Sequence, residues 1–159
     1  MDTKTRTITL KKKDIFFDID ALSLDLTRVS GDDVRKSDAV ATDTSTITGA
    51  RTFTRLADKR VADVRQMLKD FLVDVTKTGG DDLLVSSDYV ITLDITPEFP
   101  DSMLDSIIAL AHDYVVKASL ADWYTEIGTG PSANLIQLAA DSLLRIKELI
   151  YQRPIPTML

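Results

Sequence analysis

The chain contains no cysteine and only one histidine, His112, among its 159 residues. The absence of cysteine excludes disulfides, thiolate metal sites and cysteine nucleophiles, and it agrees with a cytosolic origin. Because a zinc site needs several converging His or Cys ligands, the lone His112 is a poor candidate for one. We expect His112, which lies beside Asp113 in an apolar segment, at a helix surface or at the edge of the core.

Long hydrophobic runs are also lacking. No stretch approaches 18 uninterrupted apolar residues, so we expect no membrane-spanning helix. The opening "MDTKTRTITLKKKD" has no apolar core after its basic residues and does not have the pattern of a secretory signal. Apolar residues make up 44% and charged residues 28% of the chain, which indicates one globular domain over residues 1–159.

Basic residues are scarce in the second half of the chain. Residues 81–159 carry a net charge of −8, against +2 for residues 1–80, and Lys117 is the only cation between Asp81 and Ile127. Such a surface repels phosphate, so reading or scaffolding of DNA is disfavoured. Two interpretations remain open: an acidic surface that provides solubility, or an acidic wall that faces nucleic acid without binding it.

No catalytic motif is present. Asp14, Asp18 and Asp25 fall on one side of the expected first helix, and spaced carboxylates can hold Mg²⁺ or act as an acid–base pair. However, Asp18 and Asp20 point about 200° apart on a helix and cannot chelate together. The "GTGPS" segment lacks the lysine of a phosphate loop, and no G-x-S-x-G occurs. The sequence therefore predicts no catalytic, metal or cofactor site; a hydrolase built on these aspartates is the hypothesis that it supports least.

Apolar periodicity predicts a mainly α fold, a four-helix bundle with helices near 14–29, 53–77, 101–127 and 132–152. Asp14 is the expected N-cap of the first helix and Gly31 its end. The seam of the last helix is expected to contain Leu135, Ala139, Ser142, Leu143, Ile146, Leu149 and Ile150. Because a short turn joins the last two helices, we expect them to pack antiparallel.

A small β element is expected as well. Residues 3–10 alternate polar and apolar and predict a strand or an extended N-terminal arm, whereas 32–52 is expected to be a long loop. Residues 83–95 predict a strand, or a hairpin turning at 86–88, with Tyr89, Ile91, Leu93 and Ile95 facing inward. The three lysines at 11–13 are expected to be a solvated helix start.

Two groups of residues are candidates for a partner interface. Trp123 and Tyr124 are large aromatics that either complete the core of the bundle or anchor a neighbour. Pro154 ends the last helix, and we expect residues 154–159 to form an extended tail. The tail either lies on its own bundle or docks on a neighbour, and the residues concerned are Tyr151, Arg153, Ile155, Met158 and Leu159.

The stretch "ITPEFPDSMLDSIIALAHDYVVKASLADWY", followed by a Gly/Pro break and "ANLIQLAADSLLRIKELIYQRP", resembles small structural proteins of tailed bacteriophages and prophages of gut Bacteroidetes. The layout is similar to that of head–tail connector (adaptor) proteins over residues 95–157, with "ADWY" as one of its best marks. The resemblance implies a virion protein, made in the host cytoplasm, that forms a homo-oligomeric ring at the phage neck. Its partners would be portal and tail proteins, and DNA would pass through the ring without specific binding. It also implies no enzymatic activity, cofactor or membrane. The alternative is a non-enzymatic cytosolic helical adaptor or regulatory binding module.

Overall fold

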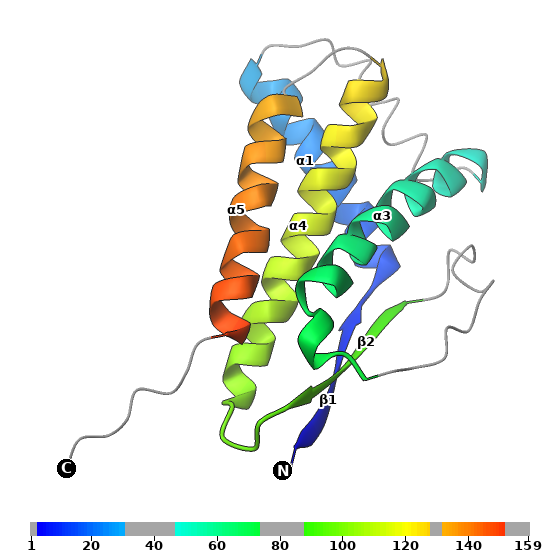
Figure 1. Cartoon of the computed structure of the whole chain (residues 1–159). Helices are drawn as coiled ribbons and strands as arrows, with labels where there is room; N and C mark the ends of the chain where they lie inside the picture. Colours follow the sequence, from blue (N-terminus) through cyan, green and yellow to red (C-terminus); the bar gives the residue numbers. More distant parts are fainter. Residues whose placement is uncertain (1–2, 31–46, 74–87, 128–131, 152–159) are drawn as a thin grey trace.

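The structure is a computed structural model that describes residues 3–30, 47–73, 88–127 and 132–151 (Figure 1). These residues form four long helices and a two-stranded antiparallel sheet, so the predicted fold class is confirmed. In chain order the elements are β1 (Lys4–Leu10), α1 (Lys12–Ser30), α3 (Ile47–Met67), the short 3₁₀ helix η1 (Lys69–Phe71), β2 (Tyr89–Ile95), α4 (Asp101–Ile127) and α5 (Ser132–Ile150).

The long helix α4 is the centre of the bundle. Its second half is apolar on nearly every side, which is the pattern of a helix surrounded by other elements. It packs against α5, α3, α1 and β1, and α5 runs antiparallel beside it as predicted (Figure 1). Its buried residues between positions 114 and 124 are Tyr114, Val115, Val116, Ala118, Ser119, Leu120, Ala121, Trp123 and Tyr124.

The small sheet lies at the end of the bundle where α4 begins (Figure 1). Its register runs from Lys4 opposite Ile95 to Leu10 opposite Tyr89. Since side chains alternate between the faces of a strand, one face is buried and the other is open. The buried set is Ile8, Leu10, Tyr89, Ile91, Leu93 and Ile95, which confirms the predicted inward residues of β2. The strand partner is the N-terminal segment, and residues 83–87 lie outside the described part of the chain.

Asp101 fixes this sheet to the start of α4. Lys4 Nζ and Arg6 Nε each lie 3.1 Å from Asp101 Oδ1, and Lys4 also donates to the carbonyl of Phe99. The hydrogen bond from Arg6, followed by that from Lys4, lowers the pKa of Asp101. A carboxylate in the first turn of a helix also interacts favourably with the helix dipole.

The predicted bounds of the second helix were wrong at both ends. Residues 47–52, which were expected to belong to the loop 32–52, are helical because α3 begins at Ile47. Extending a formed helix is far easier than nucleating one, so a Thr- and Gly-containing turn can still join it. The helix ends at Met67, where the chain turns through η1 to the sheet: Leu72 bridges Leu93. Leu72, one of the apolar residues that suggested a helix to residue 77, therefore pairs with the sheet instead, and residues 74–77 lie outside the described residues.

The start of α1 also differs from the prediction. The helix begins at Lys12, so Asp14 lies in its first turn and is not the N-cap. Lys12 is buried, with Nζ 4.9 Å from the centre of the Tyr89 ring, whereas Lys11 and Lys13 are exposed. The aliphatic part of the Lys12 side chain and the cation–π contact of its ammonium group allow this lysine to lie at the edge of the core. The expectation that all three lysines are solvated was therefore wrong for Lys12.

Within the described ranges, no helix combines the length and the apolar character that crossing a membrane requires. The predicted helix end at Gly31, residues 128–131 of the "GTGPS" turn and the tail 154–159 lie outside the described residues.

Candidate interaction surface

Helix α5 carries apolar side chains on two different faces. Its core face packs mainly on α4, and the expected seam residues of α5 are buried or half-buried. Seven large apolar side chains are exposed among the described residues, and four belong to α5 or to the residue after it: Ile136, Leu138, Leu144 and Tyr151. A helix that needed only its own bundle would expose a polar face instead.

Two of these side chains, Ile136 and Leu144, form one stripe together with the exposed Ala140. Ile136, Ala140 and Leu144 follow each other at spacings of four residues and so lie above one another on a helix. Ile136 is 46% and Leu144 53% exposed. We call the surface made by Ile136, Ala140, Leu144 and Tyr151 the α5 stripe.

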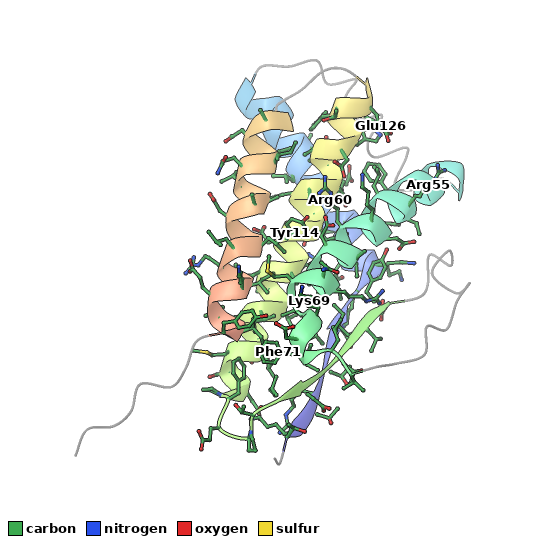
Figure 2. All side chains as sticks on the ribbon, in the orientation of Figure 1. Arg55, Arg60, Lys69, Phe71, Tyr114 and Glu126 are labelled. Atoms are coloured by element: carbon green, nitrogen blue, oxygen red, sulfur yellow. The ribbon has the colours of Figure 1, made fainter. Side chains whose placement is uncertain are left out.

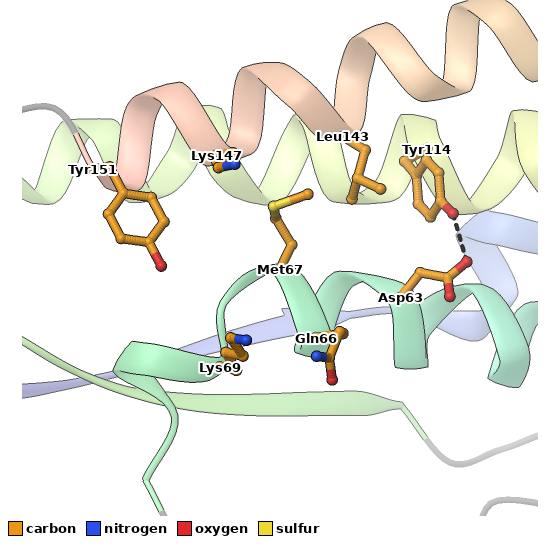
Figure 3. A pocket seen from close by; sticks show the side chains of 8 residues that line it. All are labelled: Asp63, Gln66, Met67, Lys69, Tyr114, Leu143, Lys147 and Tyr151. Carbon is orange, nitrogen blue, oxygen red and sulfur yellow. Dashed lines mark hydrogen bonds between the residues drawn. The ribbon is translucent and has the colours of Figure 1, made fainter.

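The end of the α5 stripe opens into a groove of about 440 Å³ between α3 and α5 (Figure 3). The phenol of Tyr151, 45% exposed, packs edge-on against Phe71, and its hydroxyl donates to Asp70. This hydrogen bond raises the pKa of Tyr151. Further lining residues are Asp63, Gln66, Met67, Lys69, Tyr114, Leu143 and Lys147. The groove therefore combines an apolar floor with two exposed lysines.

A polar network next to the groove joins α3 to α4 and includes two residues of its lining, Asp63 and Tyr114. Figure 2 labels Arg60 and Tyr114. Arg60 makes a bidentate ion pair with Asp122, with Nε–Oδ2 at 2.8 Å and Nη2–Oδ1 at 2.5 Å. Arg60 Nη1 also lies 3.2 Å from Asp63 Oδ2, and the hydroxyl of Tyr114 donates to that same oxygen at 2.6 Å. The network joins α3 to α4 by charge-assisted hydrogen bonds, which are stronger than neutral ones.

The pKa values of Arg60 and Tyr114 are raised within this network. The hydrogen bond to Asp122 raises the pKa of Arg60, although burial works against the charged form. Burial, followed by the hydrogen bond to Asp63, raises the pKa of Tyr114 to about 12. Arg60 and Tyr114 therefore keep their protons throughout the physiological range, and the network acts as a structural clamp between α3 and α4.

Sequence reasoning missed this clamp. It gave Arg60, Asp63 and Asp122 no role. A usable signal was the face of α4 on which Tyr114 and Asp122 lie eight residues apart, since polar groups on an otherwise buried helix need partners.

Trp123 and Tyr124 lie in the core. Trp123 is 5% exposed and stacks on Phe53 with ring centres 6.2 Å apart. Tyr124 is 2% exposed, and its hydroxyl lies 3.1 Å from the buried hydroxyl of Ser23. Of the two interpretations left open for this pair, the structure favours the core.

His112 lies at a core edge and contacts a carboxylate. Its Nε2 is 2.5 Å from Asp18 Oδ2, which links α4 to α1. Asp20 does not join this contact, in agreement with the expected divergence of Asp18 and Asp20. Among the residues that the structure describes, no three His, Asp or Glu side chains come together as metal ligands would.

The tail residues Arg153, Ile155, Met158 and Leu159 lie outside the described residues, so of the predicted interface only Tyr151 is placed at the surface.

No protein-family model matches the chain, and neither curated proteins nor solved structures gave a significant match. The family resemblance therefore stays a prediction.

Proposed function

We propose that this protein is a virion structural subunit, a ring-forming head–tail connector that joins portal and tail proteins at a phage neck. It acts through its surfaces, without catalysis or cofactors. The supporting observation is the α5 stripe, an exposed apolar row on a helix whose core face is already packed on α4. Exposed apolar rows of this kind mark sites of protein association.

The free energy available from burying the α5 stripe fits a subunit contact. Full burial of a large apolar side chain contributes about 1.5–3 kcal/mol, and Ile136, Leu144 and Tyr151 are each about half exposed. Covering them would add roughly 2–4 kcal/mol per contact before ordering costs. A single contact of that size is weak, but a closed ring repeats it around the circle and every subunit then has two neighbours.

The charge distribution supports passage of DNA without binding. Lys117, the only cation between residues 81 and 127, is 2.9 Å from Asp113 and so is already neutralised. In the proposed ring, the acid-rich surface of this region lines or approaches the channel and repels the phosphates.

The test compares two leucines of the same helix. Leu144→Asp changes the α5 stripe, whereas Leu138→Asp introduces the same charge at a similarly exposed position on another side of α5. We expect Leu144→Asp to abolish multimers in sedimentation velocity, with unchanged helix content, and Leu138→Asp to leave them intact. Equal effects of both changes would contradict a role for the α5 stripe.

The second candidate function, a free-standing cytosolic adaptor, uses the same surface for a different protein. It predicts a monomer or dimer at every concentration and for both leucine variants, so the same experiment separates the two functions.

A further inference from the structure

A second groove, separate from the α5 stripe, lies between the end of β1 and the exposed side of α4. Its volume is about 450 Å³. Thr9, Leu10 and Lys11 line one side, and Ile108 and Ala109 line the other. The remaining lining residues are Asp14, Asp105, His112 and Asp113. Because β1 lines the groove and β2 does not, the groove lies at the edge of the sheet that β1 forms.

Within the described part of the chain, this edge of the sheet has no strand beside it. The sheet has two strands, and β1 uses one edge for β2. The other edge of β2 is partly closed, since Leu72 bridges Leu93 and the amide of Val73 donates to the carbonyl of Thr92 at 3.1 Å. No described segment does the same for β1. Its backbone N–H and C=O groups on that side therefore lack a strand partner within the described residues.

The sequence of β1 does little to protect the edge. Soluble proteins usually guard a free edge with proline, a bulge or charges that project from the strand. Strand β1 has no proline and pairs continuously over seven residues without a bulge. Its two charged residues, Lys4 and Arg6, are held by Asp101 at the far end, so the end near Thr9 remains available to another strand.

The charges of the groove favour a basic occupant. Asp14 and Asp105 are exposed and make no ion pair with another described residue. Asp113 is already paired with Lys117, and His112 with Asp18. Lys11 is the only lysine or arginine in the lining, so the two unpaired carboxylates leave the groove net acidic.

We propose that an extended peptide segment of a partner protein docks in this groove as a third strand on β1. A lysine or arginine of the segment lies between Asp14 and Asp105, and its aliphatic neighbours contact Ile108 and Ala109. Addition of a strand beside a helix gives affinity through the main chain and specificity through the side chains that face the groove. This site does not depend on the α5 stripe or on ring formation.

The test uses the full-length protein and the fluorescein-labelled peptide acetyl-TVKVTV-amide, with binding followed by fluorescence anisotropy at low salt. The structure predicts saturable binding that protects amides of β1 from hydrogen exchange. Asp14→Asn with Asp105→Asn should weaken binding about two- to twentyfold, the range for two exposed charge contacts. Glu148→Gln, which removes an exposed charge on α5, should leave binding unchanged.

Two altered peptides complete the design. N-methylation of alternate residues removes the backbone donors of one edge and should weaken binding by about tenfold or more. A peptide with glutamate in place of lysine should not bind. Absence of binding by the parent peptide, equal binding of the N-methylated peptide, or indifference to the Asp14 and Asp105 changes would each overturn the proposal. Because assembly is not measured here, failure of this site is distinguishable from failure of the proposed ring.

Discussion

Replacement of Arg60 by alanine tests the clamp between α3 and α4. The side chains of Arg60 and Asp122 are 21% and 19% exposed, and the closest atoms of the guanidinium and the carboxylate are 2.5 Å apart. Removing one partner of a fully buried pair costs about 3–5 kcal/mol, because the remaining charge is left without compensation. Since both partners here retain some contact with water, we expect a loss of about 2–3 kcal/mol of unfolding free energy.

Urea denaturation followed by far-ultraviolet circular dichroism measures this loss. In a protein of this size each kcal/mol lowers the melting temperature by about 2–4 °C, so a thermal scan provides a second readout. Lys59→Ala, an exposed change one residue away, should alter stability by less than about 0.5 kcal/mol. The double change Arg60→Met and Asp122→Leu should recover part of the loss, because it leaves no unpaired charge. A loss below about 0.5 kcal/mol for Arg60→Ala would refute the reasoning.

Three further predictions follow from the same structure. Trp123→Ala should cost about 3–5 kcal/mol, measured by urea denaturation, because it removes the ring stacked on Phe53; a small loss would mean that the ring is not core. The raised pKa of Tyr114, about 12 against an ordinary value near 10, means that the folded state holds this proton more tightly. This contribution is complete below pH 10 and is lost as the pH rises towards 12, so the urea midpoint should fall more steeply there than in Tyr114→Phe. Deletion of 154–159 removes three apolar side chains worth about 4–8 kcal/mol on burial, before ordering costs; it should impair docking to a neighbour or portal and leave the melting temperature unchanged. A truncated protein that melts lower yet assembles normally would assign the tail to its own core.

The sequence predicted the last two helices well because their boundaries are set by local chemistry. Pro100 precedes the first residue of α4, and "GTGPS" follows its last turn, so both ends of this helix are marked by residues that disfavour continuation. The inward residues of β2 were likewise predictable, because period-two alternation is a property of the segment alone.

What could not be predicted depends on contacts between distant segments. Nothing near Lys4 in the sequence indicates that it will lie opposite Ile95. Likewise, the end of α3 and the turn through η1 depend on the pairing of Leu72 with Leu93 in the sheet. The partnership of Arg60 with Asp122 joins residues 62 positions apart. Trp123 illustrates the same limit. A large aromatic side chain is typical of an interface and of a core, and only the position of Phe53 favours the core.

Electron microscopy of the purified protein is the decisive test of ring formation. We expect closed rings of one size with a central opening, in which each subunit presents the α5 stripe to a neighbour. Single particles of monomer or dimer size at high protein concentration would contradict the ring-forming connector and favour the cytosolic adaptor.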